Sequence, residues 1–248
     1  MFVCFNGKEI HVSAVIWDKD GTIIDVHLYW TEVIKRRAVF ITKYYNLSND
    51  YINLIESILG LDHKSGKLKP EGPVGIKSRD EILIILTDAL IKKNVKCTLE
   101  ENTKIFEIVH KEFLKNMYDY VKVIPFVENT LKLFKERNIK QYLLTSDSFE
   151  NTEKTIKSVG LYSYFDEIHG RESFALPKYT GLPSKKLCKQ NNLDPASVLC
   201  IGDSKMDYDM AINSSCNHLI VASGQNTSFT LRSFSRNVVD SLSYIEVK

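Results

Sequence analysis

The sequence predicts an α/β protein in which a parallel sheet with helices on both faces carries an inserted block of helices. From residue 122 onward, short apolar segments alternate with amphipathic segments, which is the pattern of βα units. Between residues 26 and 119, several segments show helical periodicity, and together they fill a stretch much longer than one crossover connection needs. We therefore expect a core domain of residues 1–25 and 120–248 and a helical domain of residues 26–119.

Composition narrows the class of protein. The 248 residues suffice for both domains, and the net charge of +2 comes from basic residues spread along the chain, which gives no reason to expect a nucleic-acid partner. Five cysteines without Cys-x-x-Cys spacing favour a reducing compartment. The N-terminus lacks a signal-peptide pattern, and the apolar helical segment 82–91 is too short to cross a bilayer. These features predict a cytoplasmic protein without a nucleic-acid or membrane partner.

The first strand of the predicted core ends in two carboxylates. Residues 2–12 predict a hairpin around the Asn6-Gly7 turn, and the apolar run 14–17 then predicts a buried strand. Asp18 and Asp20 follow directly, before Gly21 breaks the strand and Thr22 adds a hydroxyl. Two converging carboxylates repel unless a cation or a shared proton lies between them. This stretch therefore predicts a metal site, a proton-shuttling pair, or both.

The inserted segment predicts four helices, at 29–46, 49–60, 80–93 and 99–118. Thr98 and Glu101 form a capping box at the start of the last helix. Between the second and third helices, residues 62–79 contain three Gly and two Pro, which exclude a helix, together with five basic residues. We interpret this segment either as a solvated loop or as a specificity loop that contacts substrate through Lys77 and Arg79.

The remainder of the chain alternates between the two kinds of element. The predicted helices are 127–138, 150–159, 182–191 and 205–214, and the predicted strands are 140–145, 165–168, 197–201 and 217–222, with a last short element near 238–242. Parallel sheets bind ligands at the carboxyl ends of their strands. Asp18, Thr145 and Asp203 each occupy such a position, so we expect them to share one site.

Four motifs on strand ends and loops occur in a characteristic order, which is Asp18-Lys19-Asp20-Gly21-Thr22, Thr145-Ser146, Lys178, and Gly202-Asp203 with Asp207. The set resembles the haloacid dehalogenase superfamily, and within it the phosphoglycolate phosphatases that carry a helical cap between the first two motifs. The resemblance implies a Rossmann-like core. Two positions depart from the family pattern. Lys19 replaces the usual Phe or Leu, and Lys178 lacks the Pro that commonly follows it.

The resemblance implies a Mg²⁺-dependent phosphatase that forms an aspartyl-phosphate. Asp18 would be the nucleophile and Asp20 the general acid and base. Lys178 and Thr145 would complete the catalytic set, and the phosphate group would be bound by Gly21, Thr22, Thr145, Ser146 and Lys178. Mg²⁺ would be held by Asp18, Asp203 and the backbone carbonyl of Asp20. Asp207 would either bind the metal through water or orient Lys178.

Other activities of the superfamily stay open. A phosphosugar mutase would use the same carboxylates, and a phosphonate hydrolase would need a Schiff-base lysine such as Lys35 or Lys43. A dehalogenase would not need Asp20. A non-catalytic protein that binds a phosphorylated metabolite is the alternative from a different class. If the chain stays extended past Asp18, Lys19 should point away from the two carboxylates.

Overall fold

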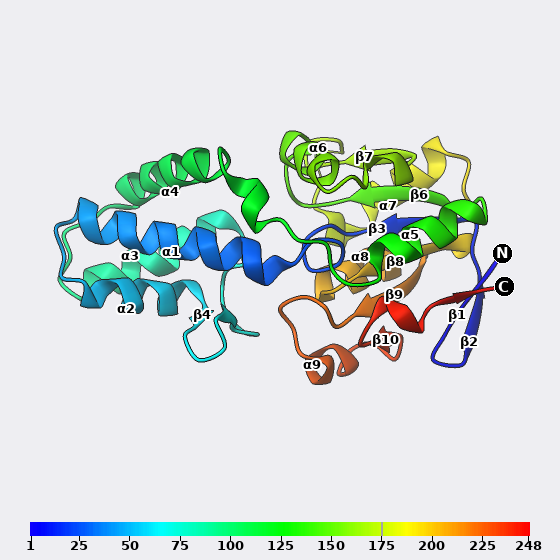
Figure 1. The fold of residues 1–248 in the computed structure, drawn as a ribbon, viewed down its shortest axis with the longest axis horizontal. Coiled ribbons are helices and arrows are strands. Elements are labelled where there is room, and N and C mark those ends of the chain that lie inside the picture. The colour runs from blue at the N-terminus through cyan, green and yellow to red at the C-terminus, as the bar shows by residue number, and fades with distance from the viewer. Residues whose placement is uncertain (175) are drawn as a thin grey trace. The chain divides into compact units, whose positions relative to one another are not determined.

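The computed structural model describes residues 1–174 and 176–248, which form two compact units. One unit contains Met1–Asp25 and Lys122–Lys248, and the other contains Val26–Val121 (Figure 1). We describe each unit by itself. Within the described residues, every helix is too short or too polar to cross a bilayer.

The first unit is built on a six-stranded parallel sheet, which confirms the predicted α/β core (Figure 1). The strand order is β10-β9-β8-β3-β6-β7, and β3 lies in the centre between β8 and β6. In register, Trp17 of β3 lies opposite Ile201 of β8 and Leu143 of β6. The strands are β3 (Ala14–Trp17), β6 (Lys140–Leu144), β7 (Glu167–His169), β8 (Val198–Gly202), β9 (Asn217–Val221) and β10 (Val238–Val239).

Helices cover both faces of this sheet because side chains alternate along each strand. Ile16 of β3 packs in a cluster with Leu187 and Met210, while the Trp17 ring lies 5.9 Å from the ring of Phe134, on a helix that packs on the other face. The strands therefore read as continuous apolar runs, as expected for a doubly covered parallel sheet. The helices are α5 (Val127–Glu136), α6 (Phe149–Ser158), α7 (Leu182–Gln190), α8 (Lys205–Ser214) and α9 (Ser228–Arg232).

A small antiparallel sheet joins the two ends of the chain. The predicted hairpin forms between β1 (Phe2–Phe5) and β2 (Lys8–His11), and Asn6 and Gly7 both adopt the positive φ of a type I′ turn. A third strand, β11 (Glu246–Val247), pairs with the free edge of β1. The sequence analysis did not predict β11, because its pairing with β1 links opposite ends of the chain.

The second unit is helical and has its own apolar core, to which all four helices contribute. These helices are α1 (Val26–Tyr44), α2 (Asp50–Leu59), α3 (Arg79–Lys92) and α4 (Leu99–Phe113). Capping boxes start α3 at Ser78 and α4 at Thr98. The segment 62–79 contains part of a short hairpin, β4 (Leu61–Asp62) with β5 (Lys67–Leu68), so it is more ordered than a plain loop.

The fourth helix is shorter than the sequence predicts. It ends at Phe113, and a 3₁₀ turn over Met117–Tyr120 follows. Phe113 and Met117 nevertheless pack in one cluster with Tyr29 and Val33 of α1. The apolar spacing therefore continues past the end of the α-helix, which explains why periodicity extended the prediction to residue 118.

The chain leaves and rejoins the first unit at neighbouring points. The N–H of Asp25 donates to the carbonyl of Lys122 at 2.8 Å, and the N–H of Ile124 donates to the carbonyl of Ile23 at 2.9 Å. Ile24 and Val123 form an antiparallel bridge between these two bonds. The two chain segments that flank the helical unit are thus held side by side within the first unit.

Candidate active site

The predicted site residues of the first unit gather at one edge of the parallel sheet. Asp18 follows β3, Thr145 follows β6, and Asp203 follows β8, and these three strands are adjacent. The N–H of Asp18 still donates to the carbonyl of Ile201 at 2.9 Å, so its backbone is fixed by the neighbouring strand. The parallel register therefore places these side chains at the same level, as the sequence predicts.

A buried lysine connects two of the carboxylates. Lys178 begins a 3₁₀ turn over Lys178–Thr180, and its Nζ donates to Asp18 Oδ1 and, at 2.7 Å, to Asp207 Oδ1. Burial alone would lower the pKa of Lys178, but Asp18 and Asp207 outweigh it and raise the pKa. The ammonium group therefore stays charged inside the protein.

Asp207 uses both of its carboxylate oxygens within the protein. Oδ1 accepts from Lys178, and Oδ2 accepts from the N–H groups of Asp203 at 3.2 Å and Ser204 at 3.0 Å and from the Ser204 hydroxyl at 2.6 Å. These bonds also cap the start of α8. Of the two roles considered for Asp207, this pattern favours the orientation of Lys178.

Asp203 lies in a tight cradle formed by two glycines and a threonine. A Cβ atom at Gly21 would lie 2.5 Å from Asp203 Oδ2, and a Cβ at Gly224 would lie 1.7 Å from the same atom. The Thr22 hydroxyl lies within hydrogen-bond distance of both Asp18 Oδ2, at 3.3 Å, and Asp203 Oδ1, at 3.4 Å. Gly21 also has a φ of +86°, which favours glycine at this turn. The position of the Asp203 carboxylate is therefore set by close packing.

The carboxylates of Asp18, Asp203 and Asp207 form a buried cluster whose ligand oxygens all lie within 4.8 Å of one another. Burial raises the pKa of Asp18 to about 7 and the pKa of Asp203 well above its usual range. Repulsion between the carboxylates raises both pKa values further. Three carboxylates against the single ammonium of Lys178 leave an excess of negative charge. An all-oxygen donor set with excess negative charge fits a hard divalent cation.

Lys19 does not point away from the pair of aspartates, so that expectation is wrong. Its Nζ lies 3.2 Å from Asp20 Oδ2 and 2.6 Å from Asp147 Oδ2, and the residue is buried. The extended strand ends before this point, because the N–H groups of Ile23 and Ile24 turn back to donate to the Lys19 carbonyl. The turn brings Lys19 and Asp20 to the same side.

Asp147 is a site residue that the sequence analysis missed. Burial tends to raise its pKa, but the ion pair with Lys19 and hydrogen bonds from Ser148 and Asn151 hold the pKa below its usual value. Burial raises the pKa of Asp20 even though Lys19 opposes this shift, and 29% of the Asp20 side chain stays exposed. Lys19, directly after a strand predicted to be buried, was the signal in the sequence that could have indicated Asp147. A buried ammonium group needs an acidic partner.

The remaining predicted residues differ in their surroundings. Thr145 is buried and its hydroxyl accepts the N–H of Asp147 at 3.2 Å, whereas the next residue, Ser146, is exposed. Lys77 and Arg79 belong to the helical unit and are exposed, with Glu81 at 3.6 Å from Lys77 and Glu107 at 4.0 Å from Arg79. These two residues are thus part of a different unit from the carboxylate cluster.

Comparisons with known proteins agree with this geometry. The model of the haloacid dehalogenase-like hydrolase family matches residues 12–214. A phosphoglycolate phosphatase of Aquifex aeolicus is 27% identical over 121 residues, which cover 49% of this chain and 56% of that protein. A candidate pyrophosphatase of Clostridium perfringens is 27% identical over 196 residues, which cover 79% of this chain and 77% of that protein.

A solved structure shows the same fold. The crystal structure of a predicted phosphoglycolate phosphatase from Haemophilus somnus superimposes with a TM-score of 0.72 at 19% identity, over 93% of this chain and 94% of that chain. The matched region of the family model contains β3, β6 and β8 together with all of the carboxylates described above. The chain belongs to the haloacid dehalogenase-like hydrolase family.

Proposed function

We propose that this protein is a Mg²⁺-dependent phosphatase that hydrolyses a small phosphomonoester through an aspartyl-phosphate on Asp18. The observation that carries the proposal is the buried Asp18 carboxylate at the end of β3, which is 4% exposed and held between Lys178 and Thr22. Such a carboxylate is positioned and partly desolvated, as a nucleophile needs to be. The names of the relatives make a phosphorylated C2 acid, 2-phosphoglycolate, the first substrate to test.

The reaction follows from the roles of the side chains. Asp18 would attack phosphorus, so that one bond forms between its carboxylate oxygen and phosphorus while the bond from phosphorus to the leaving oxygen breaks. Asp20 would give its proton to that leaving oxygen, which requires a raised pKa of the kind that burial produces here. Asp20 would then accept a proton from a water molecule that cleaves the acyl phosphate.

The other residues would bind the phosphate group and balance its charge. Thr145 would donate its hydroxyl hydrogen to a phosphate oxygen, together with backbone N–H groups near Gly21 and Ser146. Lys178 would keep Asp18 oriented and offset the approaching negative charge. Asp18 and Asp203, with the Asp20 carbonyl, would hold Mg²⁺, which would supply positive charge to the phosphoryl group.

The position of this activity in the cell is part of the same proposal. All five cysteines are free thiols, and three of them, Cys188, Cys200 and Cys216, are buried in the first unit. Free thiols suit a reducing compartment, so we expect the activity in the cytoplasm.

The experiment is a phosphate-release assay over a panel of small phosphomonoesters, with Mg²⁺ or with EDTA. We expect release by the wild type with Mg²⁺, and a decrease of about 10³-fold or more for Asp18→Asn, since the nucleophile is lost. Asp88→Asn is the matched control, because it makes the same chemical change at an exposed helical position. Normal turnover by Asp18→Asn would refute the assignment.

The alternative activities have separate signatures in the same samples. A mutase would isomerise a sugar phosphate without net phosphate release. A phosphonate hydrolase would trap covalently with borohydride and substrate at Lys35 or Lys43. A protein that only binds the metabolite would be stabilised by a panel member and turn over none of them.

A further inference from the structure

The helical unit has an arginine in its interior. Arg37 lies on α1 and is only 5% exposed. The carbon at the centre of its guanidinium group lies 3.8 Å from the centre of the Phe106 ring on α4, so that the cation stacks on the aromatic face. Stacking of this kind satisfies the flat face of a guanidinium group and leaves the N–H groups on its edge to find acceptors elsewhere.

Those N–H groups find no acceptor within the described residues. The Nε atom of Arg37 is buried and makes no hydrogen bond. In residues 1–174 and 176–248, no carboxylate oxygen lies within 4.0 Å of Arg37, and the charge that acts on its guanidinium group is that of another cation, Arg79. Burial, and to a smaller extent the charge of Arg79, lowers the pKa of Arg37 to about 9. A buried cation without a counter-ion is costly, and a nearby like charge raises that cost.

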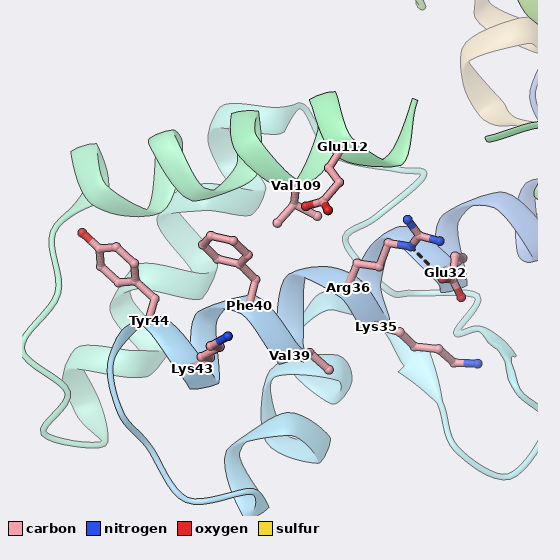
Figure 2. Close-up of a pocket in the computed structure, with 9 residues that line it drawn as sticks. All are labelled: Glu32, Lys35, Arg36, Val39, Phe40, Lys43, Tyr44, Val109 and Glu112. Atoms are coloured by element: carbon pink, nitrogen blue, oxygen red, sulfur yellow. Dashed lines mark hydrogen bonds and ion pairs between the residues drawn. The ribbon is translucent and has the colours of Figure 1, made fainter. Parts of the chain in front are cut away.

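The adjacent arginine shows how the same side chain is satisfied one position earlier on the helix. Arg36 donates to Glu32 at 2.7 Å (Figure 2). It also donates to the Tyr120 hydroxyl at 3.4 Å. It lines a pocket of about 840 Å³ between α1 and α4 that contains none of the carboxylates of the candidate active site. Arg36 is therefore a structural arginine with its own acid, and Arg37 differs from it in having none among the residues described.

We propose that the helical unit binds an oxyanion, a carboxylate or a phosphate group, at Arg37, with Arg79 as the second cation. A guanidinium group stacked on a ring presents parallel N–H donors at its edge, which match the two oxygens of such a group. Arg79 faces Glu107 only at 4.0 Å, so its charge is incompletely balanced and adds to the attraction. An anion at this point would remove the repulsion between the two arginines and supply the missing acceptors.

Two sources could provide this oxyanion, and they share the same chemistry. One is a small carboxylate and the other is a small anion of the phosphate or sulfate kind. Either would bind the helical unit by itself, whether or not a substrate is turned over. The first experiment below compares the two kinds of anion, and it does not depend on catalysis.

The first experiment measures thermal unfolding of the full chain in EDTA, with sodium sulfate or sodium malonate against sodium chloride at equal ionic strength. In chloride, Arg37→Met should unfold at the same temperature as the wild type or higher, because an unpaired buried charge is removed. Sulfate or malonate should raise the midpoint of the wild type more than that of Arg37→Met, with Arg37→Lys in between. General salt stabilisation acts on every variant alike and cancels in this comparison.

Arg36→Met is the matched control for this experiment. It should lower the midpoint in chloride, because it breaks the pair with Glu32, and should keep the wild-type response to sulfate and malonate. The proposal is overturned if Arg37→Met responds to both anions as the wild type does. A clear destabilisation of Arg37→Met in chloride together with that equal response would make Arg37 a packing residue.

The second experiment separates the anion site from the proposed function by comparing kcat/KM of Arg37→Met and wild type for ethyl phosphate, which carries no second anionic group. Arg37→Met should change this value by less than about twofold, because the anion would bind the helical unit independently of turnover. If no ester is hydrolysed, the proposed function fails while the first experiment still decides the anion site.

Discussion

Replacing Gly224 by alanine tests whether the position of the Asp203 carboxylate controls activity. The new Cβ would lie 1.7 Å from Asp203 Oδ2, whereas real Cβ atoms essentially never come closer than 3.0 Å to another heavy atom. The carboxylate must therefore retreat by more than an ångström. The backbone at Gly224 does not require glycine for its φ, so the effect comes from this contact alone.

The expected magnitudes separate folding from function. The atoms that must move all belong to the Asp203 side chain, with Oδ2 at 1.7 Å, Cγ at 2.5 Å and Cβ at 2.9 Å from the added Cβ. The free energy of unfolding should therefore fall by about 1–3 kcal/mol, as for other overpacked sites. A displacement of about 1 Å in a group that positions reactants costs about 10²-fold in rate. We therefore expect Gly224→Ala to fold, to lose about two orders of magnitude in kcat/KM, and to need more Mg²⁺ for half-maximal activity.

The assay is phosphate release as a function of Mg²⁺ concentration, with urea denaturation of the same preparations. Gly160→Ala is the control, since Gly160 has a φ of +74° and open space around it, so its replacement strains the backbone without touching the site. It should lose stability and keep the wild-type Mg²⁺ dependence. If Gly224→Ala kept both the rate and the Mg²⁺ dependence of the wild type, the Asp203 carboxylate would not be the group that positions the metal.

Two further predictions concern the charges of the site. Lys19→Met should lower the free energy of unfolding by about 2–4 kcal/mol in urea melts, because Asp20 and Asp147 lose a shared cation. Adding Asp147→Asn to this variant should recover part of the loss. An unchanged stability of Lys19→Met would contradict a buried ion pair. In EDTA, the folded protein retains a proton on Asp18, whose pKa is raised from 3.8 to about 7, so stability should fall as the pH rises through that range. Mg²⁺ should oppose this fall and Asp18→Asn should flatten it, whereas parallel pH profiles of wild type and variant would refute the assignment.

The site residues on strand ends were predictable, because parallel strands bring their carboxyl ends together whatever lies between them in the chain. Asp18, Thr145 and Asp203 follow three adjacent strands, and an apolar run before each one was visible in the sequence. Lys178 could be placed only through the order of motifs, since a single lysine in a loop carries no pattern of its own.

Residues whose roles depend on a turn or on packing could not be predicted in the same way. Lys19 reaches Asp20 and Asp147 because the chain leaves the extended conformation at the strand end, and period-two alternation does not describe that turn. Gly224 approaches Asp203 through the turn that follows β9, and such a close contact leaves no pattern in the sequence. Arg37 occupies a buried helical position that hydrophobic periodicity would assign to an apolar side chain.

The hydrogen bonds between residues 23–25 and residues 122–124 affect how readily the helical unit can be replaced. These hydrogen bonds hold the two chain segments together within the first unit. The helical unit is therefore inserted like a loop whose two ends are already joined. Loop-closure entropy grows only slowly with length, and the insertion carries an apolar core of its own. The helical unit can therefore be exchanged as a module at this junction, by swapping residues 26–121 for another helical segment or for a short linker, without redesign of the first unit.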